Sequence, residues 1–165
     1  MQFRTMFLAA IVLSILAIPA SAQPKGGASI FDVLPDLTAR VDPDGAIVIW
    51  NIGGSNVPSS FLVTIKCTVV TATVRGQTCG DAFTGGMYNK VMTLPAGSNQ
   101  PIYKRPPEQQ TTALTEYGKG WAVIYPGMHA WPKGTYKFDV FADSGMSIQE
   151  KLETNNKDAK EVLKN

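Results

Sequence analysis

Residues 134–156 read GTYKFDVFADSGMSIQEKLETNN, and this segment opens with a strictly alternating pattern. One side of the extended chain carries its apolar residues, namely Tyr136, Phe138, Val140 and Ala142. Asp143-Ser144-Gly145 follows, and its aspartate and glycine favour a turn. The pattern predicts a β-strand with one buried face that ends in a turn. Such a strand must pack against other elements, so we expect the rest of the chain to supply more strands.

Upstream of this segment, short apolar or alternating runs are separated by turn-forming residues. The clearest run is Phe61–Val69, whose alternation directs Cys67 inward and which we expect to continue to Val74 after a bend. Residues 42–45, Asp-Pro-Asp-Gly, predict a tight turn, because proline presets φ and glycine accepts the closing conformation. The other expected strands are Leu37–Val41, Ala46–Trp50, Lys90–Leu94, Pro101–Lys104, Trp121–Tyr125 and Lys157–Leu163. By contrast, residues 80–89 are expected to form a loop and residues 112–117 a helical turn.

About seven short strands with turns between them, and no repeated helical spans, predict an all-β protein. The expected architecture is a sandwich of antiparallel strands, and a closed barrel is the alternative. The lysines of Lys157–Leu163 are expected to protect the exposed edge of the final strand.

Residues 1–22 have the features of a signal peptide. Arg4 gives a basic start, Met6–Ala20 is an apolar run too short for a stable membrane span, and Ala20-Ser21-Ala22 is a small-x-small cleavage site. Cleavage before Gln23 leaves 143 of the 165 residues, enough for one domain with a real core. We therefore expect an exported protein, periplasmic or extracellular, with a flexible lead-in at 23–34, one domain at 35–165 and no remaining membrane span.

The charge balance argues against two classes of partner. After cleavage, 14 basic residues face 13 acidic ones, which gives a net charge of +1. This balance provides no electrostatic footprint for nucleic acid and no polybasic patch for a membrane surface.

Cys67 and Cys79 are the only cysteines of the chain, and export would place them where disulfides persist. A bridge that closes about a dozen residues contributes roughly 3 kcal/mol on the loop-entropy estimate. The competing interpretation, a metal pair, lacks further cysteines or clustered histidines at ligand spacing. The sequence therefore predicts a disulfide.

Several short motifs, taken in order, resemble the CARDB family of cell-adhesion-related domains found in bacteria and archaea. These motifs are Pro35-Asp36-Leu37, Asn51-Ile52-Gly53, Phe61-Leu62-Val63, Leu94-Pro95-Ala96-Gly97, Gly134-Thr135-Tyr136 through Ala142-Asp143, and Glu150, Glu153 and Asn155-Asn156. The resemblance implies an immunoglobulin-like β-sandwich of about seven antiparallel strands that serves as an extracytoplasmic binding or adhesion module. It transfers no catalytic residue. The chain departs from the family in its cysteine pair and in a longer segment, residues 98–133, before the penultimate strand.

Aromatic residues in this longer segment are the candidate ligand-binding residues. They are Trp131, Tyr125, Trp121 and Tyr103. Exposed rings there would stack on sugar faces or anchor a protein partner, because indole and phenol combine a large contact area with a polar group. Alternatively, the segment covers one sheet and buries its rings. We favour burial for Trp121, binding for Trp131 in its loop bounded by proline and glycine, and a core position for Trp50.

Polar residues provide weaker candidates. Asp143, Glu150, Glu153 and Asn155 could together offer oxygen atoms to calcium, but their spacing matches no known calcium loop. Asn51 and the Asn155-Asn156 pair are better explained as turn-forming residues. His129 is the only histidine, and the sequence identifies no partner to orient it as a general base. We therefore expect no metal site, no cofactor and no catalytic residue.

The resulting hypothesis is an exported, non-catalytic binding or adhesion module that recognises a protein or glycan of the cell envelope or the extracellular space. The alternative is a carbohydrate-binding module that uses aromatic rings of residues 98–133. A small hydrolase is a third class, which would need two facing carboxylates in a cleft.

Overall fold

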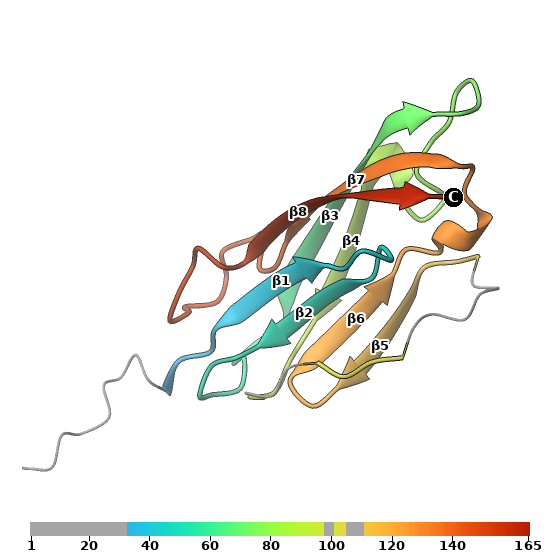
Figure 1. Ribbon diagram of the computed structural model, residues 1–165. Coiled ribbons are helices and arrows are strands. Elements are labelled where there is room, and N and C mark those ends of the chain that lie inside the picture. The colour runs from blue at the N-terminus through green and yellow to red at the C-terminus, as the bar shows by residue number, and fades with distance from the viewer. Residues whose placement is uncertain (1–32, 98–100, 105–110) are drawn as a thin grey trace, which may run out of the picture.

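The computed structural model describes residues 33–97, 101–104 and 111–165, and Figure 1 shows the two layers of strands that they form. The expected signal peptide and most of the expected lead-in lie outside these residues. No helix in the described ranges is long and apolar enough to cross a membrane.

The described residues form eight strands in two antiparallel sheets. The first sheet contains β1 (Leu37–Val41), β2 (Ile47–Asn51), β6 (Trp121–Tyr125) and β5 (Leu114–Gly118), in the spatial order β1-β2-β6-β5. The second sheet contains β4 (Met87–Met92), β3 (Phe61–Ala72), β7 (Gly134–Phe141) and β8 (Lys157–Lys164), in the order β4-β3-β7-β8. Two 3-10 turns, η2 (Thr84–Gly86) and η3 (Met128–Ala130), lie in the connections.

This strand order is that of an immunoglobulin domain. Such domains place strands A, B, E and D in one sheet and C, F and G in the other, which some members extend with strand C′. If β1 to β3 are strands A to C, β4 is C′ and β5 to β8 are D to G, the two sheets become A-B-E-D and C′-C-F-G. The expected immunoglobulin-like β-sandwich is confirmed.

The core lies between the sheets and follows the alternation seen in the sequence. Side chains of β3 and β7 that are at most 1% exposed supply much of it, namely Phe61, Val63, Ile65, Tyr136, Phe138 and Val140. The Tyr136 hydroxyl donates to the Pro132 carbonyl at 2.8 Å, an arrangement like the tyrosine corner at the start of strand F in immunoglobulin domains. The alternation predicted for β7 is therefore confirmed, and its apolar face packs on the first sheet.

Three local expectations were wrong. Residues 112–117 form no helical turn, because residues from Leu114 onward make the edge strand β5, which pairs with β6. Exposed Leu114 and Tyr117 blur the alternation of this strand, so its pairing with β6 decides its conformation. The β4 strand begins at Met87, inside the expected loop, and residues 101–104 form no strand. The segment 98–133 thus supplies two strands of the first sheet.

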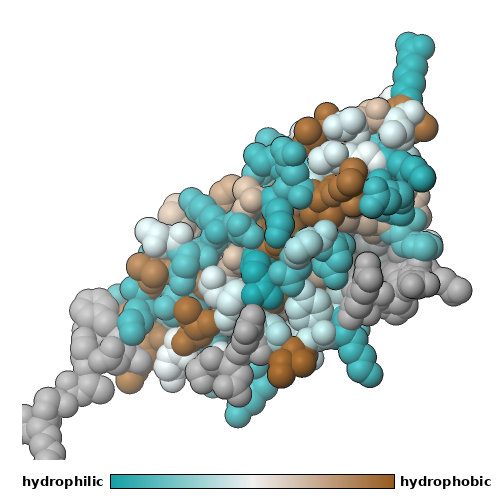
Figure 2. All heavy atoms as spheres, viewed as in Figure 1, coloured by the Kyte–Doolittle hydropathy of each residue, from teal (hydrophilic) through white to brown (hydrophobic). Residues whose placement is uncertain are grey.

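The two sides of the sandwich differ. On one side, β1 contacts β8: the main-chain N–H groups of Ala39 and Val41 donate to the Asn155 carbonyl at 3.3 Å and to Asp158 Oδ2 at 2.7 Å. On the opposite side, β4 and β5 end their sheets with no further strand paired to them in the described chain. On the face in Figure 2, hydrophobic groups lie in separate patches among hydrophilic ones. Within the described chain, the outer edges of β4 and β5 therefore pair with no strand, whereas β1 bonds to Asn155 and Asp158.

Candidate functional site

A pocket of about 700 Å³ opens at one end of the sandwich. Its walls come from residues within 74–82, which follow β3, within 111–113, which precede β5, and within 126–132, which connect β6 to β7. Tyr88 of β4 completes the lining. Because these segments belong to both sheets, the pocket exists only in the folded sandwich.

The pocket wall after β3 is fixed by a disulfide and by one glutamine. Cys67 and Cys79 are both buried and form the expected bridge, with their Cα atoms 6.1 Å apart. Gln77 Oε1 accepts from the main-chain N–H of Thr73 at 2.9 Å, and its Nε2 donates to the Lys133 carbonyl at 3.1 Å. The second bond reaches the connection between β6 and β7. The two facing loops are thus joined to each other, and the pocket is preorganised.

Trp131, the favoured binding residue, lines this pocket but is only 7% exposed. Its indole packs edge-to-face on Phe83 at a centroid distance of 5.5 Å, and against Tyr136 and Phe138 at 4.9 and 6.0 Å. The bounding proline and glycine suggested an exposed loop, but η3 precedes Trp131 and the ring packs into the core. The expectation of an exposed Trp131 ring was therefore wrong, and only an edge of the indole is available to the pocket.

The other three candidate aromatics gather on the outer face of the first sheet. Tyr125 belongs there to a small apolar cluster, against which Trp121 and Tyr103 pack. Tyr125 is 1% exposed, and the single proton of its hydroxyl has two acceptors within reach, the Lys104 carbonyl at 2.7 Å and Glu116 Oε2 at 3.2 Å. Burial, with a smaller contribution from the charge of Glu116, raises the pKa of Tyr125. Tyr125 is therefore a structural residue in this arrangement.

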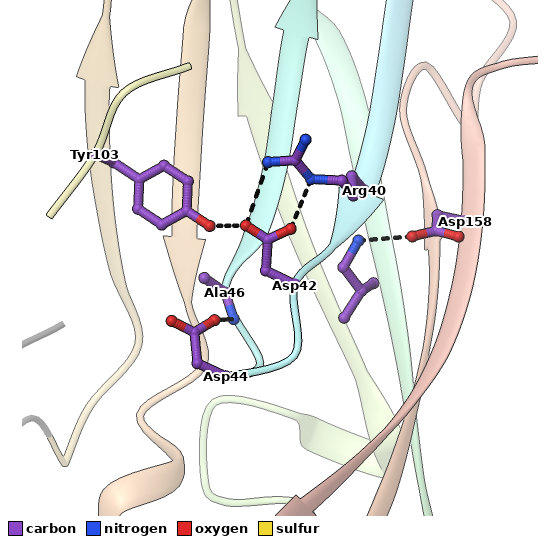
Figure 3. A network of polar contacts seen from close by, with 7 residues as sticks. Arg40, Asp42, Asp44, Ala46, Tyr103 and Asp158 are labelled. Carbon is purple, nitrogen blue, oxygen red and sulfur yellow. Dashed lines mark hydrogen bonds and ion pairs between the residues drawn. The ribbon is translucent and has the colours of Figure 1, made fainter. Parts of the chain in front are cut away.

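Tyr103 attaches residues 101–104 to this outer face (Figure 3). Its hydroxyl donates to the Asp42 carboxylate, which also accepts from Arg40 Nε at 2.6 Å. Together with the bond from Tyr125 to Lys104, this contact makes residues 101–104 a cover over part of the sheet. This part of the long segment matches the alternative in which it covers a sheet.

Trp121 lies flat on the same outer face. A Cβ atom placed on Gly118 would lie 2.0 Å from Trp121 Cε2, so the indole crosses the backbone of this glycine on the neighbouring strand. Trp50 is the cross-strand partner of Trp121. The Arg40 guanidinium lies 5.3 Å from the centroid of the Trp50 ring. The core position expected for Trp50 was wrong, because Ile49 takes the inward position and the alternation turns Trp50 outward. Two half-buried indoles are therefore neighbours on this face.

The asparagine and acidic residues at the other end of the sandwich fix loops. Asn51 is fully buried, and its Oδ1 accepts from the main-chain N–H groups of Asp36 and Gly53, both at 3.0 Å. Asp143 has a positive φ of 47° and accepts from the N–H groups of Ser147 and Ile148 at 3.0 and 2.8 Å. Asp143 is a turn-forming residue, as expected, whereas Asn51 also joins its turn to the segments before β1 and after β4.

Glu150 joins the last loop to β1. Its Oε2 accepts from the Leu37 N–H at 2.5 Å, and its Oε1 accepts from Asn156 Nδ2 at 2.9 Å. Burial raises the pKa of Glu150 to about 7, and the nearby carboxylates of Glu153 and Asp143 act in the same direction. No group of three or more His, Cys, Asp and Glu residues in the described ranges is arranged to hold a metal ion.

Comparison with known proteins gives little beyond the fold. The chain matches no protein-family model and no curated protein. A solved structure with a similar fold is the CARDB domain of a Pyrococcus furiosus protein, crystallised in complex with di-metal ions. It is 19% identical, the match covers 79% of this chain and 88% of that one, and the TM-score is 0.45. A similarity of this size carries no argument about function. Membership of the CARDB family stays a prediction, whereas the immunoglobulin-like arrangement follows from the strand order.

Sequence reasoning missed the residues that shape the pocket. Gln77 was not among the candidate residues, although its side chain joins two loops. Gly80 lies against Trp131, where a Cβ would be 2.2 Å from the indole Nε1. A disulfide that encloses Gln77 and is followed directly by Gly80 was the one signal of a fixed loop in this region.

Proposed function

We propose that this protein is an exported, non-catalytic binding domain that recognises a partner of the cell envelope or the extracellular space. The observation that carries the proposal is the pocket of about 700 Å³ at the disulfide end. Its volume is in the range of known ligand sites, and its lining mixes apolar groups with a few hydrogen-bonding ones. Its main wall is held by the Cys67–Cys79 bridge and by Gln77, so little ordering entropy is lost when a ligand binds.

The position of the pocket fits this proposal. Loops gather at the two ends of an immunoglobulin-like sandwich, and the recognition loops of antibody variable domains lie at one such end. Here the opposite end carries the loop-fixing bonds of Asn51, Asp143 and Glu150. The disulfide end is therefore the end with an open pocket and a rigid wall.

A blocking substitution tests this proposal. Thr78 is exposed and lines the pocket, so Thr78→Trp would fill part of it without changing the core. Thr68→Trp is the matched control, because Thr68 is exposed on β3 and lies outside the pocket lining. The exported form of each variant would be used to capture partners from envelope extract and on a glycan array. Binding lost in Thr78→Trp and kept in Thr68→Trp supports the pocket, whereas equal binding by both variants refutes it.

A second candidate function is carbohydrate binding on the outer face of the first sheet. The specific observation is that Trp121 lies flat over Gly118 beside Trp50, which leaves one indole face turned away from the sheet. An indole in this orientation can stack on a sugar ring. Trp121→Ala would then abolish a glycan signal that Thr78→Trp leaves intact.

A further inference from the structure

No hydrogen bond from the indole N–H of Trp131 is found among the described residues, and Nε1 is not one of their buried unpartnered atoms, so this N–H reaches solvent although the side chain is only 7% exposed. Buried tryptophans usually pair this group. The Nε1 atom lies against Gly80, and both residues line the pocket. The pocket therefore contains a fixed donor that a ligand acceptor can satisfy.

The ring faces of Trp131 are not available for stacking. Phe83, Tyr136 and Phe138 pack on the indole at centroid distances of 5.5, 4.9 and 6.0 Å. Carbohydrate recognition commonly uses an open aromatic face, whereas this indole offers only its edge. The pocket therefore suits a ligand that presents a hydrogen-bond acceptor and an apolar group rather than a sugar ring.

The rest of the lining has the chemistry of a peptide site. Val74, Ala113 and Pro126 supply apolar surface, and Thr78 supplies a hydroxyl. Arg75 and Asp81 are both exposed at the pocket and have opposite charges. This balance selects neither an anion nor a cation, which suits the uncharged main chain of a peptide.

The pocket also borders a strand edge with which no described strand pairs. Residues 111–113 line the pocket and lead directly into β5, which ends the first sheet. An extended chain can add to such an edge through main-chain hydrogen bonds, while its side chains enter adjacent pockets. The place where β5 begins is where both interactions can occur together.

From these observations we propose that the pocket binds an extended peptide segment of a protein partner. An apolar side chain of the peptide occupies the pocket, a main-chain carbonyl accepts from the Trp131 indole N–H, and the peptide continues beside β5. This inference rests on the proposed function, because it names the class of ligand for the same pocket.

The probe is a phage-displayed library of random nine-residue peptides, selected on the exported form of the full chain. We expect apolar peptides whose binding is abolished by Thr78→Trp and weakened about two- to tenfold by Trp131→Phe, which removes only the N–H and part of the ring. Trp50→Phe is the matched control, because Trp50 lies outside the pocket lining, and it should leave the affinity unchanged. Thermal melting checks that each variant is folded, and Trp131 fluorescence can be read alone in the Trp50→Phe, Trp121→Phe double variant.

The outcomes separate this inference from the proposed function. Two outcomes would overturn the peptide assignment: a glycan whose binding depends on Thr78 and Trp131, or a library that yields no binder. The proposed function would still be decided by partner capture with Thr78→Trp and Thr68→Trp. Peptides that bind Thr78→Trp and Trp131→Phe as tightly as the unmodified chain would overturn both.

Discussion

Gln77 Nε2 donates to the hydroxyl oxygen of Tyr136 across 2.8 Å, and this bond joins the disulfide loop to strand β7. The same hydroxyl donates to the Pro132 carbonyl, so it both accepts and donates a hydrogen bond. Burial raises the pKa of Tyr136, and the bond from Gln77 lowers it. The wall of the pocket is thereby coupled to a fully buried residue of the core.

Tyr136→Phe should destabilise the protein by about 1–3 kcal/mol, because it removes both bonds and leaves buried partners unsatisfied. Tyr88→Phe is the matched control, because Tyr88 is half-buried and packs on Phe83 through its ring. This substitution should lower the free energy of unfolding by less than about 0.5 kcal/mol. Urea unfolding measures both changes. Equal losses in the two variants would show that the Tyr136 hydroxyl does not tie the loop to the core.

The Cys67–Cys79 bridge should be present in the protein recovered from the exported fraction. Titration under denaturing, non-reducing conditions should find no free thiol, and reduction should lower the free energy of unfolding by about 2–4 kcal/mol. Two titratable thiols in the exported protein would contradict the bridge. Reduction should also weaken binding at the pocket, because the wall after β3 would lose its covalent attachment.

Gly80→Ala should displace the indole of Trp131. The added Cβ would lie 2.2 Å from Nε1 and 2.8 Å from Cε2, so the ring or the loop must move at a cost of about 1–3 kcal/mol. Gly145→Ala is the control, because a Cβ there meets no atom within 4 Å. Melting temperature and tryptophan emission should change in the first variant only. Unchanged emission in Gly80→Ala would mean that the loop is not packed on Trp131.

Glu150 should make stability depend on pH. In the unfolded chain its carboxyl loses a proton near pH 4.5, whereas in the folded protein, where its pKa is about 7, it keeps that proton longer. Between these two pH values the folded state binds more protons than the unfolded state. The contribution of Glu150 to the free energy of unfolding therefore falls as pH rises, by at most about 3 kcal/mol.

Glu150→Gln should remove this decline, and Glu161→Gln, at an exposed position on β8, should keep it. Unfolding curves between pH 4 and 8 for the three proteins provide the measurement. A slope that persists in Glu150→Gln would assign the pH dependence to another group.

The alternation of β3 and β7 was readable because each has one inward face of large apolar residues between turn signals. The first sheet was harder to interpret, because it is covered on both faces. Val48 and Ile49 are both fully buried, one on the outer face and one in the core, so alternation could not say which side Trp50 would take. The β5 strand was hidden because an edge strand can form from half-exposed residues once a partner strand is present.

The pocket itself was not predictable from sequence. Trp131 could be identified as a candidate residue, but its burial depends on packing against Phe83, far away in the sequence, and against the β7 residues Tyr136 and Phe138. The bonds from Gln77 to Lys133 and Tyr136 likewise span 56 and 59 residues. Long-range contacts of single polar side chains leave no periodic signal in the sequence.

Hydrogen–deuterium exchange of the exported protein, with and without a captured partner, tests the binding site most directly. Ligand binding should protect the backbone within residues 74–82, 111–113 and 126–132, which form the pocket. Protection confined to β2 and β6, under the Trp50 and Trp121 face, or to the loops fixed by Asp143 and Glu150, would contradict a ligand site at the disulfide end.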